Sequence, residues 1–287
     1  MLRTFRERKG LQVFSLMFPG GFWLITFFAL PLLMILAISL LSRDDLGRPS
    51  PPWTLSNYQQ AFDPLYVNLF LYSIGVALLT TLLTLVIAYP VALYMARLPR
   101  KWRGVATLLV MIPFWTNFLV RTYALQFLMR ANGPINTLLL GLGLIQEPIP
   151  ILSTPFAVLV GLVYGELPFM ILPLYASLEK FDWSMIEAAQ DLGANAFRVF
   201  TRVMLPLTAP GILAGSILVF VPSVGSYITV ELMGGGKINM IGRAIAQQFG
   251  ASGNWPFGSA MSLLLMVIVT AAALAYFRIG RGERTRL

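Results

Sequence analysis

The sequence predicts an all-α membrane protein with six transmembrane helices, and three observations support that prediction. Hydrophobic residues make up 57% of the chain and charged residues only 11%, a balance that a soluble domain would not tolerate. Six apolar runs each approach the length, about 20 residues, that a helix needs to cross a bilayer. The total of 287 residues suits one bundle of such helices with its loops.

The first apolar run decides whether the chain keeps an N-terminal helix. The six runs cover residues 14–41, 68–96, 105–127, 155–178, 209–233 and 259–277. The first is longer than the apolar part of a cleaved signal peptide, about 7–15 residues, and it lacks an obvious small-residue cleavage site. We therefore expect a basic N-terminus over 1–13, a transmembrane domain over 14–277 and a basic C-terminus over 278–287.

Basic residues predict which side of the membrane each connector faces. With the N-terminus inside, fifteen Lys and Arg residues fall in cytoplasmic segments and five in outer loops, while Arg121 lies within a span. This excess follows the positive-inside rule, so both termini and the loop over residues 179–208 are expected in the cytoplasm. The net charge of +9 is then explained by topology, and we expect no nucleic-acid partner.

The outer connectors predict structural roles and not a binding site. Residues 42–67 are rich in proline, aspartate and polar groups, which is typical of a solvated connector, and the run 135–145 is too short to span and predicts an interfacial helix. Glycines 234–236 precede Lys237 without a following Ser or Thr. They therefore predict a turn and not a phosphate-binding loop.

Several function classes are excluded by composition. The chain has no cysteine and no histidine, which removes disulfides, Cys/His metal sites and thiol or imidazole catalysis. An intramembrane aspartyl protease needs paired aspartates in the spans, whereas Asp182 and Asp191 lie in the 179–208 loop. We therefore expect no enzyme activity, no metal site and no cofactor bound by this chain.

The 179–208 loop is a polar island between two apolar runs. Its charged residues are Glu179, Lys180, Asp182, Glu187, Asp191, Arg198 and Arg202. Ser184 and Glu187 have the spacing of a capping box, and Gly193 stands where a positive φ would end the first helix.

A second short helix is expected after Gly193. Asn195 can cap it, and its predicted apolar stripe consists of Phe197, Phe200, Val203 and Met204. Pro206 is expected to stop it. Two helices joined by glycine would form a half-polar knob on the membrane surface, suited to a partner's groove.

Polar residues within the spans are candidates for a substrate pathway. Charges inside a bilayer are costly, about 2.5–3.5 kcal/mol each on insertion scales, so they pair or line a pathway. The candidates are Trp115, Asn117, Arg121, Tyr164, Glu166, Ser226, Tyr227 and Glu231.

For Arg121 and Glu166 the alternative is a structural ion pair between helices. Glu231, at the outer end of the fifth span, is favoured as a pathway residue. Carboxylates beside aromatic rings suit an organic cation.

Prolines interrupt the middle spans and expose backbone carbonyls. They are Pro90, Pro113, Pro168, Pro173 and Pro222. Membrane helices tolerate such breaks mainly where protein or a water-filled cavity accepts the freed carbonyl. Simple kinking of the helices is the alternative interpretation.

The 179–208 loop resembles the signature loop of ABC-importer permeases. The loop matches that pattern in full: Glu187-Ala188-Ala189 is followed after three residues by Gly193. After nine further residues come a hydrophobic residue, one spacer and Leu205-Pro206. The resemblance implies the six-helix permease fold and a coupling helix that docks into an ATPase subunit. The residues assigned to coupling are Glu187, Ala188, Ala189, Asp191, Gly193, Phe197, Leu205 and Pro206.

Shorter strings resemble the spermidine/putrescine type of importer permease, the first of its two membrane subunits. They begin at Pro113, Leu167, Glu179, Asp191, Pro206, Met233 and Trp255. The likeness covers about residues 22–277. One departure is Gly165-Glu166, which stands where the best-known member has bulkier apolar residues and leaves the role of Glu166 open.

This resemblance implies a complex in a bacterial inner membrane. Its other members would be a second similar permease, two copies of an ATPase that holds ATP and Mg, and an extracytoplasmic substrate-binding protein, with membrane lipid around the permeases. Transport would proceed by alternating access. Two alternatives remain: a stand-alone secondary transporter or channel for small cations, and an ABC-importer permease for a different small solute.

Overall fold

The computed structural model describes residue 13 and residues 16–44 and 47–282. The basic N-terminal segment and the end of the basic C-terminal segment lie outside the described residues. The chain divides into two compact units. One contains the residues up to Asp63 together with Ile245–Met266, and the other contains Pro64–Ala244 and the residues from Val267 onward.

The described residues contain five helices that are long and apolar enough to cross a membrane. They are Leu16–Ser39, Pro64–Arg97, Pro155–Glu179, Ala196–Val224 and Trp255–Tyr276. A bent pair, Arg100–Trp115 with Phe118–Gly141, makes a sixth span if it is counted as one. The predicted all-α membrane fold is therefore confirmed, with one span in two pieces.

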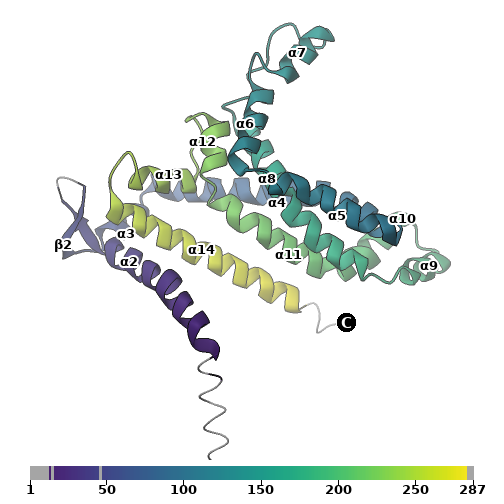
Figure 1. Cartoon of the computed structure of the whole chain (residues 1–287), viewed down its shortest axis with the longest axis horizontal. Coiled ribbons are helices and arrows are strands. Elements are labelled where there is room, and N and C mark those ends of the chain that lie inside the picture. The colour runs from purple at the N-terminus through teal and green to yellow at the C-terminus, as the bar shows by residue number, and fades with distance from the viewer. Residues whose placement is uncertain (1–12, 14–15, 45–46, 283–287) are drawn as a thin grey trace, which may run out of the picture. The chain divides into compact units, whose positions relative to one another are not determined.

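Three helices form the core of the larger unit: α4 (Pro64–Arg97), α8 (Pro155–Glu179) and α11 (Leu205–Val224), which pack against one another (Figure 1). Alanines 88, 92 and 96 follow one face of α4 and are fully or almost fully buried. On α8 they meet Met170, Leu174 and Leu178. Small side chains let helix backbones approach closely, which is how helices associate in lipid.

The third span is not continuous, so the expectation of one helix over 105–127 is wrong. Helix α5 (Arg100–Trp115) ends at Trp115 and α6 (Phe118–Met129) leaves at 87° to it. Asn117 caps α6, because its side-chain oxygen accepts the N–H of Leu119 at 2.8 Å. A further helix, α7 (Pro134–Gly141), confirms the short helix expected in the following apolar run.

The fifth span begins earlier and ends earlier than predicted. A helix runs without a break through α10 (Ala196–Val199), the π-turn η2 (Phe200–Met204) and α11. Pro206 does not stop this helix. Leu205 donates its N–H to Phe200 five residues earlier, and this wider turn lets the helix continue into a proline that lacks an N–H. The same arrangement, η1 (Ile25–Ala29) before α2 (Leu30–Ser39), occurs in the first span.

The end of α11 at Val224 separates α12 (Ile228–Gly234) from the span. Glu231 therefore lies on a short separate helix and not on the fifth span, which corrects its predicted placement. Gly161 on α8 allows α12 to approach closely, since a Cβ there would lie 2.8 Å from the Thr229 methyl group.

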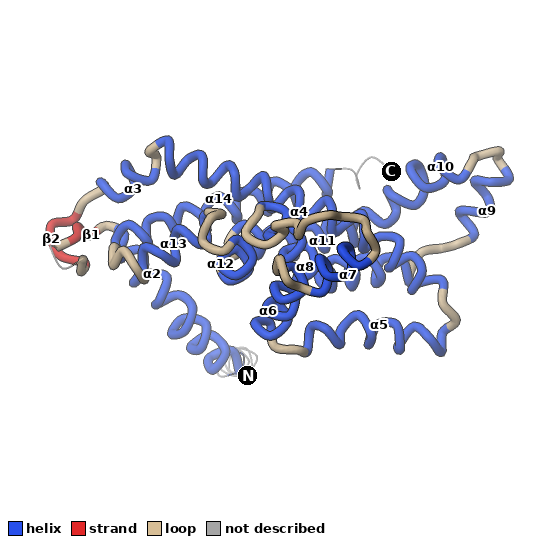
Figure 2. The backbone as a smooth tube through the Cα atoms, turned by 90° about the horizontal axis from the view of Figure 1, so that it is seen from above, coloured by secondary structure: helices blue, strands red, loops and turns tan. Residues whose placement is uncertain are grey.

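The smaller unit contains a hairpin that was not predicted within 42–67. Strands β1 (Leu41–Arg43) and β2 (Pro49–Trp53) pair antiparallel and precede α3 (Ser56–Ala61) (Figure 2). Asn57 on α3 donates to the carbonyls of Ser39 and Leu41 at 2.9 and 2.8 Å. The remaining helices of the chain are α13 (Ile241–Phe249) and α14 (Trp255–Gly282).

Candidate coupling knob and transmembrane cavity

Residues 182–199 form a compact helical turn-back, which we call the coupling knob, at one end of the larger unit (Figure 1). Its first helix is α9 (Ser184–Asp191), which follows Trp183, and the Asp182 side chain holds the start of this helix through Ser184. The Oδ1 of Asp182 accepts the N–H of Ser184 at 3.0 Å and its hydroxyl at 2.8 Å. The predicted Ser184–Glu187 capping box is therefore wrong, because Ser184 is the first residue of the helix and its hydroxyl donates to Asp182. These hydrogen bonds, the one from the Ser184 hydroxyl first, lower the pKa of Asp182.

The turn between the two helices of the coupling knob is as predicted. Gly193 has φ +80° and donates its N–H to Gln190 at 2.8 Å, while Ala194 donates to Ala189 at 3.0 Å. These two bonds satisfy the last carbonyls of α9. Asn195 then caps α10 by accepting the N–H of Arg198 at 2.9 Å.

The coupling knob has one face against the bundle and one face exposed. Trp183, Ile186 and Ala189 pack on the core formed by α4, α8 and α11. The most exposed large apolar side chains of the coupling knob are Leu192 at 89% and Phe197 at 72%, and Met185 is exposed as well. Such an exposed apolar surface is typical of an interaction site.

Two acidic residues of the coupling knob, Glu187 and Asp191, are also exposed, as is Ala188. Neither ion pair among the described residues involves either carboxylate. Both acids are therefore free to meet a basic partner surface.

The predicted apolar stripe of the second helix does not share one face. Met204 is buried, and Phe200 packs edge-to-face on Tyr89 with ring centroids 5.3 Å apart. Phe197 alone of these three is exposed. The π-turn after Val199 changes the angular position of every later residue, so the 3.6-residue spacing does not hold across it.

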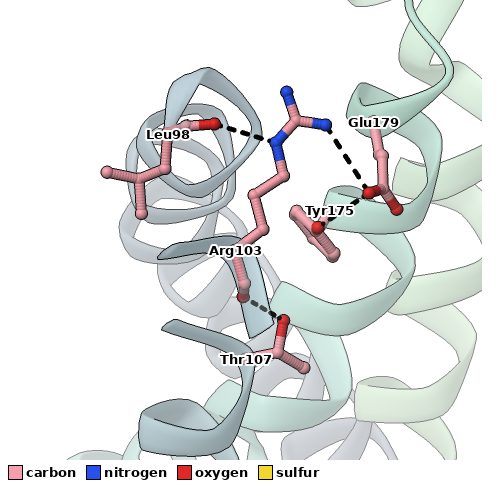
Figure 3. Close-up of polar contacts among 5 residues, drawn as sticks. All are labelled: Leu98, Arg103, Thr107, Tyr175 and Glu179. Carbon is pink, nitrogen blue, oxygen red and sulfur yellow. Dashed lines mark hydrogen bonds and ion pairs between the residues drawn. The ribbon is translucent and has the colours of Figure 1, made fainter. Parts of the chain in front are cut away.

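Side chains from α4, α5 and α8 hold the base of the coupling knob. The Arg97 guanidinium lies 5.2 Å from the Trp183 ring centroid, a cation–π distance. Nearby, Arg103 forms an ion pair with Glu179 at 3.6 Å and donates to the Leu98 carbonyl at 2.9 Å (Figure 3).

Sequence reasoning missed Arg97 and Arg103 as contacts, because they were interpreted only as positive-inside charges. The Tyr175 hydroxyl also donates to Glu179, at 3.0 Å (Figure 3). A groove of about 510 Å³ lies along α5 here, and Trp115 lines it together with Arg100, Arg103 and Met111. Trp115 is thus separated from the other pathway candidates.

A second cavity, of about 310 Å³, lies farther along α8; we call it the transmembrane cavity. It is lined by Phe118, Gly161, Leu162, Gly165, Glu166, Pro222, Ser226, Tyr227, Ile228 and Thr229. Three predicted pathway residues, Glu166, Ser226 and Tyr227, therefore meet at one place. Oε2 of Glu166 is buried, and no hydrogen bond to it is formed within the described chain.

Arg121 does not form the ion pair with Glu166 that was considered as an alternative. Within the described residues the ion pairs are Arg103–Glu179 and Arg243–Glu231. Arg121 instead donates to the Pro113 carbonyl at 3.1 Å, and its guanidinium lies 5.6 Å from the ring centroids of both Phe118 and Tyr164. It thus satisfies a carbonyl left open by the helix break.

The other two candidates are engaged outside the transmembrane cavity. Glu231 on α12 pairs with Arg243, which is only 7% exposed and also contacts Asn239. Asn117 uses its side-chain oxygen to cap α6. A pathway role for these residues stays a prediction, whereas their structural contacts are clear.

Comparison with known proteins assigns the family. Residues 88–285 match the family described as "Binding-protein-dependent transport system inner membrane component". The chain belongs to this family. It is 46% identical to the spermidine/putrescine transport system permease protein PotB of Escherichia coli (strain K12) over 259 residues, which are 90% of this chain and 94% of that protein. Its identity to the Haemophilus influenzae protein of the same name is 44%, covering 89% and 90% of the two chains.

Solved structures agree with the fold. A bacterial ABC transporter that imports the acidic polysaccharide alginate matches with a TM-score of 0.71 at 15% identity, covering 97% of this chain and 98% of that one. The MetNI methionine ABC transporter matches with a TM-score of 0.51 at 22% identity, covering 77% and 99%. The chain is therefore an ABC-importer permease subunit, a transport component and not an enzyme.

Proposed function

We propose that this permease moves a polyamine-like organic cation, of the spermidine/putrescine class, into the cell. The observation that carries the proposal is the 46% identity over 90% of the chain to a permease named for those two substrates. The transmembrane cavity is consistent with it, because it combines one carboxyl group with aromatic walls.

The proposed complex contains this chain, a second similar permease, two ATPase copies and an extracytoplasmic substrate-binding protein. It lies in a bacterial inner membrane, with both termini and the coupling knob in the cytoplasm. ATP and Mg belong to the ATPase, since the sequence of this chain contains no nucleotide-binding motif.

In the proposed mechanism, closure of the ATPase pair pushes on the coupling knob and opens the pathway outward. The push reaches the bundle by two routes. One is the uninterrupted helix from Ala196 to Val224. The other is the contact of Trp183 with Arg97 at the end of α4. Helices that move as rigid bodies can then alternate access to a central site.

Competition uptake through the assembled complex tests this proposal. Labelled spermidine uptake is measured in proteoliposomes that contain the complete complex, with excess putrescine, a neutral amino acid or a sugar as competitor. We expect putrescine to inhibit spermidine uptake at a concentration at least about tenfold lower than the neutral amino acid or the sugar. The reason is that a carboxylate site discriminates by charge.

Two results would contradict the proposal in different ways. Competition by a sugar, without competition by putrescine, would remove the substrate class but keep the importer. Uptake by this chain reconstituted without its partners would instead favour a stand-alone transporter.

A further inference from the structure

We propose that the transmembrane cavity binds an ammonium group of the transported cation, with Glu166 as counter-ion and Phe118 and Tyr227 as walls. The inference rests on the proposed function and adds the place on this chain where the substrate is held. Glu166 is near the midpoint of α8.

The first argument is the state of the Glu166 carboxyl group. Its Oε2 is buried and accepts no hydrogen bond from any described residue. A carboxylate can only accept hydrogen bonds, whereas an ammonium carries three donors and a positive charge. One ammonium group would therefore supply both the missing hydrogen bond and the missing charge.

The second argument is that no cation of the protein takes this place. Arg121 on α6 is held by the Pro113 carbonyl at 3.1 Å and by the rings of Phe118 and Tyr164. The ion pairs formed among the described residues leave Glu166 out. Arg121 thus acts on the carboxyl group only from beyond ion-pair distance, and direct contact with Glu166 is left to a mobile cation.

The third argument separates an organic cation from a metal ion. In the described part of the chain, no group of three or more acidic, His or Cys side chains could hold a metal, and hard metals take six or more oxygen ligands. The cavity instead joins a single carboxyl group to aromatic rings and to the open backbone at Gly165. An alkylammonium fits that combination through charge and cation–π contact.

Kinetics of the complete reconstituted complex test the site. Glu166→Gln removes the charge and keeps the shape, and Glu166→Asp keeps the charge. The matched control is Glu147→Gln, an exposed carboxyl group in the loop after α7. We expect kcat/KM for spermidine uptake to fall about tenfold or more in Glu166→Gln. Glu166→Asp should retain more activity, and the control should equal the wild type.

A second variant keeps the test decisive if Glu166→Gln does not assemble. A Cβ at Gly165 meets nothing within 4 Å, so Gly165→Leu starts a bulky side chain in open space at the cavity wall. Gly75→Leu on α4 is the control, since its Cβ is equally unhindered and it does not line the cavity. We expect Gly165→Leu to abolish uptake while assembly and basal ATP hydrolysis stay normal.

The outcomes separate this inference from the proposed function. Wild-type kinetics in Glu166→Gln, or in Gly165→Leu, would overturn the ammonium site although the wild-type complex transports polyamines. Equal loss in Glu166→Gln of uptake and of basal ATP hydrolysis would assign Glu166 a structural role and also overturn it. Failure of the wild-type complex to take polyamines would instead defeat the proposed function.

Discussion

Gly193 shows at the scale of one residue why the coupling knob needs a particular amino acid. Space is not the reason, because a Cβ there would meet no atom within 4 Å. The reason is its φ of +80°, a conformation that costs most L-residues about 1–2 kcal/mol. Asparagine adopts it more readily than other residues do, and a β-branched residue adopts it least.

We therefore expect Gly193→Val to uncouple transport and Gly193→Asn to keep most of it. In the valine variant, uptake by the reconstituted complex should fall at least about tenfold, because α10 would leave α9 in another direction. Membrane insertion should be unchanged. The control is Gly104→Val, where φ is ordinary and the space is also open. Equal uptake by the valine and asparagine variants would contradict the conformational argument.

The acidic candidates show what can be predicted for single residues. Membrane depth drew attention to Glu166, whose pathway role stays a prediction, but the same reasoning applied to Glu231 did not anticipate Arg243 as its partner. Arg243 was counted as an outer-loop charge, and its burial depends on tertiary contacts that local sequence does not carry. Gly161 in the cavity wall was not singled out from the sequence.

At the scale of elements, capping residues decide where the helices begin and end. The Gly193 and Asn195 caps were predicted, because each uses a residue type with a strong local preference. The start of α9 was misplaced by one residue, since Ser184 was expected as the cap but is the first residue of the helix and donates its N–H to Asp182. The break after Trp115 was missed because the apolar run continues across it, although Thr116-Asn117 carried a cap signal.

The Asp182 cap makes α9 stable over a wide pH range. Because hydrogen bonds from Ser184 lower the pKa of Asp182, the cap contributes its stability at every pH above the ordinary aspartate value, about 3.9. It loses that contribution only as the pH falls through the lowered folded-state value. We expect amide hydrogen exchange over residues 183–190, corrected for intrinsic rates, to be constant between about pH 5 and 8.

Substitutions at the cap check the same point. Asp182→Ala should speed exchange in the first turn of α9, whereas Asp182→Asn should not, since its side-chain oxygen also accepts the Ser184 N–H. Faster exchange toward pH 5 in the wild type would show that another group controls the start of this helix.

At the scale of the whole molecule, the proposed orientation places the coupling knob inside the cell and α7 outside. The apolar runs predicted the number of spans, because hydrophobic length is set by the bilayer and not by tertiary packing. The π-turns, the hairpin and the bend were not predictable in this way. They arise from local features that hydropathy does not record: prolines after the π-turns, the pairing of β1 with β2, and the cap at Asn117.

The orientation can be measured directly because the chain contains no cysteine. Single cysteines at two exposed loop positions, Pro99→Cys and Gln146→Cys, are treated with a membrane-impermeant maleimide in spheroplasts. We expect Gln146→Cys to react at once and Pro99→Cys to react only after lysis, with at least about a tenfold difference in rate. The reverse pattern would place the coupling knob on the wrong side for an ATPase.

The π-turn over Phe200–Met204 also sets the rotational orientation of the coupling knob about the α11 axis. An α-helix rotates about 100° per residue, and the wide turn holds one residue more than an ordinary one. Deletion of one residue within the π-turn would leave the helix continuous, but it would rotate the coupling knob about the helix axis by about 100°. A change too small to alter hydropathy could thus turn the docking surface away from the subunit it must meet.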